Sequence, residues 1–315
     1  MSKMITVGNA KKKFRWGNKA IVWLMMLPGL VYLFINNYMP MYGITIAFKA
    51  PDFSLDSLFD SPWNHFENFQ FLFETDEIWL YVRNTVLYSV TFLVLNIIIP
   101  VTMAILFTNI RGKRLKGLYQ TVILLPYLMS WVVVSYIAFA LFSGENGMIN
   151  ALISSNGGTK INFYGADAKW AWPFILTFFN MWKGVGFSFL FYYSACLAIS
   201  PSLYEAAKLD GASYWKQVWH VTLPGIKPVV ITMFILGLGS LVRSDYGLFY
   251  LVTKNSGQLY EVTQTIDTYV FNALKNDGNI AMSSAASVLQ SLVGFVMIVA
   301  ANLILKKVSP ENAMF

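Results

Sequence analysis

The chain has 315 residues, of which 56% are hydrophobic and only 12% charged, and its mean hydropathy is +0.53. Soluble globular domains carry roughly 25% charged residues, so this composition excludes an ordinary soluble protein and indicates a membrane protein. The formal charge of +7 comes from short basic clusters beside apolar runs, a pattern that reflects membrane topology rather than nucleic-acid binding. The single cysteine, Cys196, excludes a disulfide framework or a Cys-based metal site and is interpreted as a small packing residue.

Six apolar segments are long enough to cross the hydrocarbon core as helices, which takes about 20 residues. They are predicted at 20–47, 84–108, 118–142, 172–198, 226–251 and 284–305. The first segment lacks a small-residue cleavage site after it, so we interpret it as an uncleaved span. Because no interdomain linker or repeat is found, we predict one all-α, polytopic transmembrane domain over 1–315.

The basic residues in the short loops predict the orientation. The tail at 1–19 carries six Lys or Arg and no acid, and 109–117 carries four, so both are assigned to the cytoplasm. Between 49 and 80 the chain has one base and seven acids, which is typical of the outer side. An even number of spans then places both termini in the cytoplasm.

Three external connections, 49–83, 143–171 and 252–283, are predicted to be longer than simple turns. The first is rich in aromatic side chains, which favours amphipathic helices at the level of the lipid headgroups. Docking of an external partner is the alternative for this segment.

A polar segment, 200–225, lies between the fourth and fifth predicted spans. Pro201 suits the first helical position after a Ser200 cap, while Ser202 with Glu205 spells a capping box. Both registers predict a helix of two turns that ends at Asp210 and Gly211, where glycine can adopt a left-handed conformation.

A second short helix is predicted from Ser213 to about Val221. Its larger side chains are expected toward one side of the helix: Tyr214, Trp215, Val218 and Trp219. Pro224 and Pro228 are expected to break this helix before the fifth span.

The same segment contains Glu-Ala-Ala, followed after three residues by Gly. After nine more residues come an aliphatic residue, one more residue and then Leu-Pro. This pattern resembles the EAA loop of the membrane subunits of binding-protein-dependent ABC importers, with Val221 at the usual isoleucine position. The residues assigned to coupling are Glu205, Ala206, Ala207, Asp210, Gly211, Leu223 and Pro224. The resemblance implies a coupling helix that sits in a cleft of an ATP-binding subunit and converts closure of the ATPase dimer into movement of the spans. An interfacial helix-turn-helix without a partner is the alternative.

Further segments, at 26–48, 244–252, 259–271 and 310–315, are similar to oligosaccharide-importing permeases of the LplB type, within the maltose-transporter class. This resemblance covers essentially the whole chain and implies the type I ABC importer transmembrane fold. It also implies three partners: a second homologous permease, an ATP-binding cassette ATPase dimer and an extracellular lipoprotein solute-binding protein. The stretch Ser244 to Gly247 departs from the Asp-Gln sequence of many relatives, so it is not used to identify a sugar.

The chain lacks the G-x-x-x-x-G-K-[ST] phosphate loop, so ATP and Mg²⁺ are assigned to a partner ATPase and no cofactor to this chain. His65 and His220 have no second ligand at suitable spacing, and no nucleophile–base pattern is found. We therefore predict a non-catalytic permease subunit in the bacterial plasma membrane.

A sugar route needs aromatic faces and polar side chains in a cavity shielded from lipid. The pathway residues predicted here are Trp131, Asn180, Trp182, Tyr192, Tyr193 and Gln290. Other polar or aromatic residues considered are Asn96, Tyr127, Ser130 and Lys183. Core packing or interface anchoring is the alternative for each aromatic residue, and interhelix hydrogen bonding for each amide. Arg243 and Asp245 are expected either to pair with another chain or to extend toward the outer surface.

These features favour one half of a heterodimeric permease that imports an oligosaccharide by alternating access. The alternative is a stand-alone secondary transporter or channel for a small polar solute. Secondary transporters commonly contain repeats and broken helices near the midplane, and neither is found in the sequence. An intramembrane enzyme would need acid–base or metal clusters within the spans.

Overall fold

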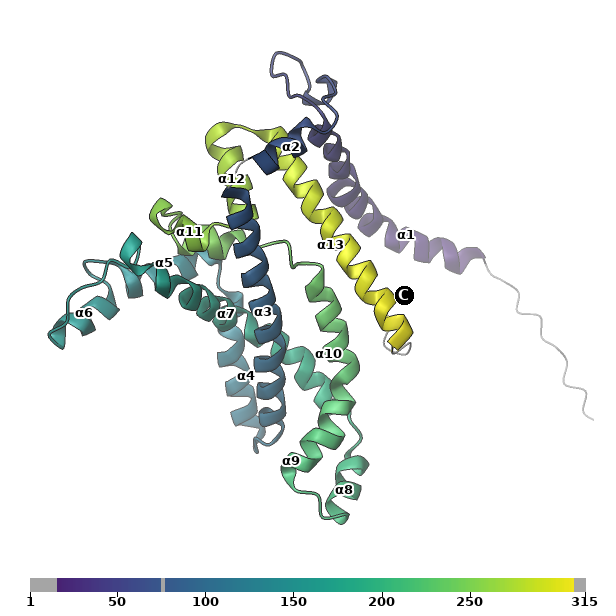
Figure 1. Ribbon diagram of the computed structural model, residues 1–315. Coiled ribbons are helices and arrows are strands. Elements are labelled where there is room, and N and C mark those ends of the chain that lie inside the picture. The colour runs from purple at the N-terminus through teal and green to yellow at the C-terminus, as the bar shows by residue number, and fades with distance from the viewer. Residues whose placement is uncertain (1–15, 75–76, 309–315) are drawn as a thin grey trace, which may run out of the picture.

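The computed structural model describes residues 16–74 and 77–308, which are almost entirely helical (Figure 1). Within these ranges, strand-type pairing occurs at an isolated antiparallel bridge between Lys49 and Trp63. The α-helices are α1 (Trp16–Leu33), α2 (Glu67–Glu74), α3 (Glu77–Thr108), α4 (Lys113–Leu128), α5 (Trp131–Phe142), α6 (Met148–Ser155), α7 (Trp172–Ala198), α8 (Pro201–Leu209), α9 (Tyr214–Gln217), α10 (Leu223–Leu238), α11 (Tyr260–Thr263), α12 (Ile266–Asp277) and α13 (Ile280–Val308). Short 3₁₀ or π segments are η1 (Phe34–Tyr38), η2 (Met39–Phe48), η3 (Leu58–Asp60), η4 (Ala166–Ala171), η5 (Val218–Thr222), η6 (Gly247–Val252) and η7 (Gly257–Leu259).

Six membrane crossings are present when one bent helix pair is counted as a span. Five helices in the described residues are long and apolar enough to cross: Ile21–Phe48, Glu77–Thr108, Ala166–Ala198, Tyr214–Leu238 and Ile280–Lys307. The sixth crossing is the pair α4 and α5. The basic tail at 1–15 and the segment 310–315 lie outside the described residues.

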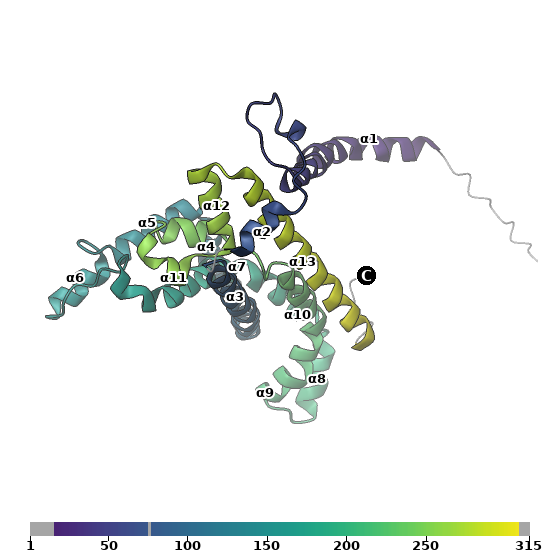
Figure 2. The same ribbon diagram turned by 45° about the horizontal axis from the view of Figure 1, so that its top comes forward.

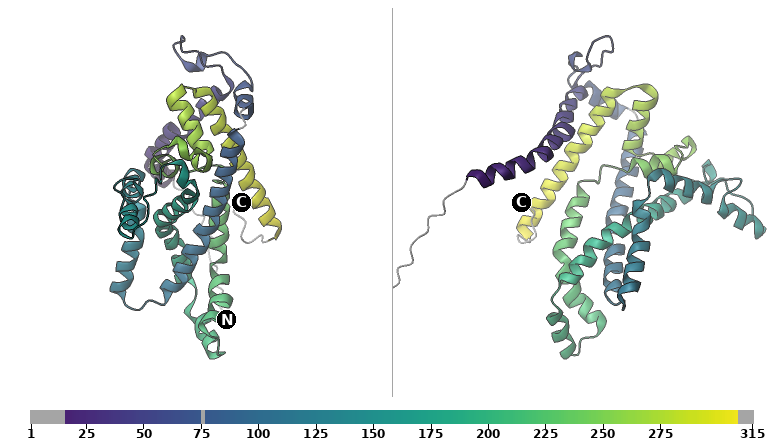
Figure 3. Two further views of the ribbon diagram at one scale, coloured as in Figure 1. Left: turned by 60° about the vertical axis from the view of Figure 1, so that its left-hand side comes forward. Right: turned by 180° about the vertical axis from the view of Figure 1, so that it is seen from behind.

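The crossing helices α3, α4, α7 and α10 form a bundle with distinct ends (Figure 1). Helices α8 and α9 lie at one end, together with the connection between α3 and α4, whereas α2 and α12 lie at the other end. The connection 109–117, assigned to the cytoplasm from its charge, therefore shares an end with the polar segment 200–225. Helix α13 runs beside α10, and α1 stands apart from the bundle (Figure 2 and Figure 3, right), with the side chains of 21–42 exposed.

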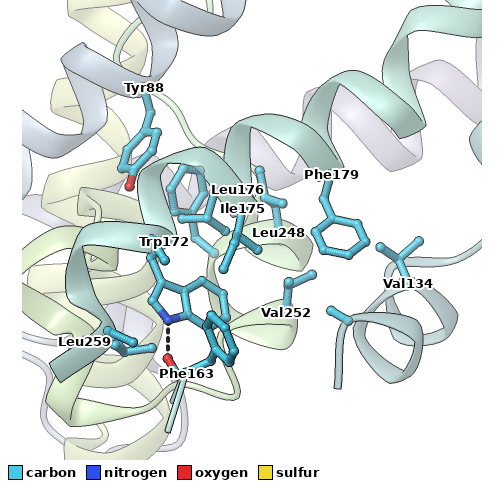
Figure 4. Packing of buried hydrophobic residues seen from close by; sticks show 14 residues of the cluster. Tyr88, Val134, Phe163, Trp172, Ile175, Leu176, Phe179, Leu248, Val252 and Leu259 are labelled. Carbon is cyan, nitrogen blue, oxygen red and sulfur yellow. Dashed lines mark hydrogen bonds between the residues drawn. The ribbon is translucent and has the colours of Figure 1, made fainter. Parts of the chain in front are cut away.

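The core near the outer end is built around α7, α5 and η6 (Figure 4). Trp172 at its centre is fully buried, and its indole Nε1 donates a 2.6 Å hydrogen bond to the carbonyl oxygen of Phe163. A second buried cluster near the inner end joins α3, α7 and the start of α10, where Phe107 packs against Phe189 and Tyr193. Between these two clusters the packing is less complete, and a cavity lies there.

Helices α4 and α7 approach closely at Gly186. A Cβ atom at this position would overlap the carbonyl group of Ile123 and would lie 3.1 Å from the Cα atom of Leu124. At Gly184 a Cβ atom would meet only Asn96, at 3.6 Å, which is an ordinary contact. Glycine at position 186 therefore sets how near the two helices can pack.

The predicted third span, 118–142, is not one straight helix. Helix α4 ends at Leu128, α5 begins at Trp131, and the two are bent by 95°. Pro126 lacks an N–H for the last turn of α4, Met129 is extended, and the Ser130 hydroxyl accepts from the Val133 N–H at 3.3 Å to start α5. The apolar composition of this region hid these local signals for a break.

The predicted fifth span, 226–251, is also wrong beyond its middle. Helix α10 ends at Leu238, and residues 239–245 form turns and extended chain before a helix restarts at Tyr246. Gly237 weakens the last turn of the helix by about 1 kcal/mol relative to alanine, and Gly239 is the C-cap. The Asp245 carboxylate then accepts from the N–H groups of Gly247 and Leu248, at 2.8 and 3.4 Å, and starts the next helix. The expected absence of broken helices is therefore contradicted.

The two breaks are joined by a side-chain hydrogen bond. Trp131 Nε1, at the start of α5, donates to Asp245 Oδ2 at 2.7 Å. The Trp131 ring also lies against Gly247, which leaves no room for a Cβ atom there. The bent third span and the interrupted fifth span are thus held together at one point.

The predicted break at Pro224 and Pro228 does not occur, since a continuous helical segment runs from Tyr214 to Leu238. A π turn, η5, precedes Pro224, and the Leu223 N–H reaches back to the Val218 carbonyl oxygen. Pro224 has no N–H to donate, and at the first or second position of α10 the helix does not need one. The helix therefore continues from the polar loop into the span.

We predict that Gly186→Ala destabilises the protein, whereas Gly184→Ala does not. Overpacking costs about 1–3 kcal/mol, and the better helix propensity of alanine recovers only about 1 kcal/mol. Thermal unfolding of the two variants in detergent provides the measurement. Equal melting temperatures for both variants would contradict the close contact between α4 and α7.

Replacing Trp131 with Phe is expected to loosen the start of η6. The substitution keeps an aromatic ring but removes the donor to Asp245, at a cost of about 1–2 kcal/mol. Hydrogen exchange at the amides of 246–249 should accelerate about tenfold. Trp182→Phe is the control, because the Trp182 indole packs without a hydrogen bond in the described chain, and it should leave this exchange unchanged. Equal exchange in the two variants would show that the bond does not hold the segment.

Candidate functional site

A cavity lies between the middle of α3, the middle of α7 and the two helix breaks. The first break is at residues 129–130 and the second at 239–245. The volume of the cavity is about 570 Å³, within the roughly 300–1,000 Å³ typical of small-molecule sites. The lining includes Ser89 and Asn96 of α3, Tyr127 and Trp131 beside the first break, Asn180, Lys183, Phe187, Ser188 and Tyr192 of α7, and Ser240, Arg243, Ser244 and Asp245 of the second break. Polar and aromatic groups therefore meet at the depth where both spans are interrupted.

The aromatic part of the lining centres on a stacked pair. The rings of Tyr127 and Phe187 are 4.6 Å apart with an angle of 7° between their planes. Both side chains are about 40% exposed, at 40% and 41%. Flat, accessible rings of this kind can contact the apolar face of a sugar.

The amide part of the lining links the two central helices. Asn96 of α3 donates through Nδ2 to Asn180 Oδ1 of α7 at 3.3 Å. Each amide keeps further donor and acceptor capacity for hydroxyl groups. Such polar groups would be costly against lipid, but the cavity gives them a suitable environment.

Charged side chains complete the lining. Lys183 Nζ donates to the Tyr127 carbonyl oxygen at 3.0 Å, and Arg243 Nη2 donates to Ser291 Oγ at 2.7 Å. Asp245 accepts from Trp131 and from the backbone at the start of η6. Arg243 and Asp245 therefore line the cavity, and the Arg243 guanidinium extends from it to Ser291 of α13.

The structure brings some of the predicted pathway residues together and separates others. Trp131, Asn180 and Tyr192 line the cavity. Trp182 packs against the outer core, and Tyr193 lies in the inner core. Gln290 is buried behind the second break, where its Nε2 donates to the Val242 carbonyl oxygen at 2.7 Å.

Phe187, Arg243 and Asp245 were missing from the predicted pathway set. Phe187 lies seven residues after Asn180 and four after Lys183, so all three share one face of α7. That spacing could have identified Phe187 from the sequence. Arg243 and Asp245 required knowledge that the fifth span ends at Leu238.

The predicted coupling loop forms one short helix, α8, and the first turns of the continuous segment Tyr214–Leu238, on either side of a glycine turn. Gly211 has φ +73°, as expected for a left-handed residue. The N–H of Ala212 reaches the Ala207 carbonyl oxygen at 2.9 Å and that of Gly211 reaches Lys208 at 3.0 Å, which is the Schellman pattern. Leu209 is 90% exposed at the tip, so an apolar side chain projects from the end of the bundle.

The start of α8 follows one of the two registers considered. Pro201 occupies the first helical position, as predicted, but Ser200 makes no capping bond to the backbone. The Ser200 and Ser202 hydroxyls instead lie 2.8 Å apart, so the predicted capping box is wrong. Proline alone preorganises this helix start.

The large side chains of the second helix divide between two sides, contrary to expectation. Val218 is buried, and the Tyr214 hydroxyl accepts from Asn109 Nδ2 at 2.6 Å. Trp215 and Trp219 are exposed at 62% and 66%. One side of the loop therefore contacts the connection between α3 and α4, while two indoles face outward.

The coupling residues remain accessible at this end of the bundle. Glu205 and Ala206 are exposed, and Ala207 is half-buried. At the opposite end, Lys169 Nζ lies 2.8 Å from Glu261 Oε2, and this hydrogen bond and charge lower the pKa of Glu261.

Comparison with known proteins supports the resemblance of the 205–224 motif. The family model described as the binding-protein-dependent transport system inner membrane component matches residues 96–310. The polygalacturonan/rhamnogalacturonan transport system permease protein YteP of Bacillus subtilis (strain 168) is 36% identical over 292 residues, covering 92% of this chain and 89% of that protein. Protein LplB of the same organism is 33% identical over 304 residues, covering 96% and 92%.

The fold is also found in a solved transporter. A chain in the crystal structure of a bacterial ABC transporter involved in the import of the acidic polysaccharide alginate aligns with a TM-score of 0.82 and 25% identity, covering 93% of this chain and 97% of that chain. The predicted all-α, polytopic fold of an ABC importer membrane subunit is confirmed, as is its place in the bacterial plasma membrane. The chain belongs to the family of inner membrane components of binding-protein-dependent transport systems.

Proposed function

We propose that this chain is one half of the permease of an ATP-driven carbohydrate importer, and that an oligosaccharide crosses through the cavity between α3, α7 and the two breaks. The observation that carries this proposal is the cavity lining, which combines a stacked aromatic pair with an amide pair. Rings and amides together match the alternating apolar and hydroxyl surfaces of a sugar. The names of YteP and the alginate importer also describe carbohydrate transport.

The partners follow from the surfaces and from the family. A second, homologous permease subunit would close the exposed side of the cavity, and a solute-binding protein would deliver the sugar at the end that carries α2 and α12. The loop at 200–225 would contact an ATP-binding cassette ATPase, which uses ATP and Mg²⁺. Exposed Leu209 and Glu205 offer that ATPase an apolar and a charged contact.

The proposed coupling is mechanical. Because η5 joins the loop to α10 without a break, a displacement of α8 and α9 would reach the helix that ends at the cavity. Leu223 and Pro224 lie at that junction, and the Schellman turn at Gly211 fixes the angle between the two short helices. ATPase closure would thereby alter access to the cavity, as alternating access requires.

The stand-alone secondary transporter is the rival function. The broken helices remove the argument that the sequence offered against it, since such breaks are common in that class. Membership of the binding-protein-dependent family now favours the importer. Co-purification tests this choice directly, because a secondary transporter would recruit no ATPase.

We predict that Glu205→Lys and Gly211→Pro leave membrane insertion intact but uncouple ATP hydrolysis from sugar uptake. The first reverses a charge at the exposed loop, and the second replaces a residue at φ +73°, a value that proline cannot adopt. Uptake and ATPase activity in proteoliposomes give the readout, with the wild-type transporter as the reference. Normal coupled uptake in both loop variants would contradict the assignment.

Phe187→Leu should weaken sugar handling without changing the fold. Leucine keeps apolar volume but removes the stacked ring, a loss of about 0.5–1.5 kcal/mol, so the KM for uptake should rise about two- to tenfold. Phe174→Leu, at a side chain on the same helix that does not line the cavity, is the matched control. An unchanged KM in Phe187→Leu would remove the aromatic pair from the route.

A further inference from the structure

Two cations face the cavity, and neither forms an ion pair within the described chain. Lys183 Nζ lies 5.4 Å from the centre of the Tyr127 ring and 5.2 Å from that of Trp131, while Arg243 contacts the neutral Ser291 hydroxyl. The ion pair found among the described residues, Lys169 with Glu261, is elsewhere. Cations at membrane depth pair with anions or backbone carbonyls, or face water. Lys183 has a carbonyl partner and Arg243 a hydroxyl partner, so an anionic occupant would supply the counter-charge that both lack.

The nearby carboxylate of Asp245 does not supply that anion. Its Oδ2 atom accepts from the Trp131 indole at 2.7 Å, and its Oδ1 atom accepts from the N–H groups of Gly247 and Leu248. These three donors hold the negative charge at the start of η6, and no ion pair links it to Lys183 or Arg243. The two cations therefore keep their charge available to a ligand.

Both cations also keep unused hydrogen-bond donors. An ammonium has three N–H donors and a guanidinium has five. Among the described residues, Lys183 makes one hydrogen bond through its ammonium and Arg243 makes one through Nη2. The aromatic rings beneath Lys183 hold it in place by cation–π attraction, but they do not neutralise it. A carboxylate would accept from either group through charge-assisted bonds, which are about twice as strong as neutral ones.

We propose that the transported sugar is acidic, with a uronate carboxylate bound by Lys183 and Arg243 while a ring of the same sugar contacts the Tyr127–Phe187 pair. This inference rests on the proposed importer function and adds the charge of its substrate. The cavity holds both required elements, since all four residues line it. A neutral sugar would use the rings and amides but would leave the two cations without a counter-charge.

Equilibrium binding to the assembled transporter, with its partner permease and ATPase in detergent, tests this proposal. Leaving out the binding protein makes the cavity the site that is measured. The probes are trigalacturonate and its fully methyl-esterified form, which differ in charge but share the sugar backbone. We expect trigalacturonate to bind at least about tenfold more tightly than the ester.

Lys183→Gln and Arg243→Gln should each reduce this preference to about threefold or less, because each removes one of the charge-assisted contacts. Lys254→Gln is the matched control. Lys254 also lies over two aromatic rings, those of Tyr136 and Phe139 at 4.8 and 5.3 Å, but it does not line this cavity. The control should keep the full preference for the acid.

Three outcomes would overturn the acidic substrate. The first is equal affinity for the two probes, and the second is no binding of either. The third is loss of the partner permease in Lys183→Gln, because this would show that Lys183 pairs across the subunit interface. Failure of the proposed importer function would be seen separately, as a wild-type complex that recruits no ATPase.

Discussion

The backbone that follows the crossing helix Tyr214–Leu238 leaves the helix at residues 239–245 and needs hydrogen-bond partners within the protein, and the rest of the site depends on how they are supplied. Lipid offers no hydrogen bonds, so each freed backbone group must find a partner within the protein. Three neighbouring helices provide them: Ser89 of α3 donates to the Arg243 carbonyl oxygen, Asp267 of α12 accepts from the Ser244 N–H, and Gln290 of α13 donates to the Val242 carbonyl oxygen. The break is therefore a built feature that joins three helices.

This network explains why the cavity is polar. A continuous fifth helix would satisfy its own backbone and would need no partners from its neighbours. The break instead turns Arg243 and Asp245 toward the same space as Lys183, and the bond from Trp131 ties it to the bend in the third span. The outer half of the fold thus supports a charged site, while the coupling loop is joined to the inner end of α10.

Much of the fold could be predicted from the sequence because apolar length and loop charge are strong signals. The span at 172–198 and the turn at Gly211 were located correctly, and the motif at 205–224 identified the family. The breaks could not be read in the same way, because residues 129–130 lie inside an apolar run and the polar residues of 239–245 are flanked by apolar segments on both sides. Gln290 lies outside this cavity, and its partners belong to a break that the sequence did not reveal.

The central claim is that the space between the two breaks is the sugar route. Ser240→Cys places a thiol in this cavity, and the native Cys196 is buried, so a water-soluble methanethiosulfonate reagent can report on the new position. In the assembled transporter the thiol should be labelled, and sugar-loaded binding protein with ATP should slow that labelling. A thiol that the reagent never reaches, or one labelled at the same rate with and without sugar, would contradict the account.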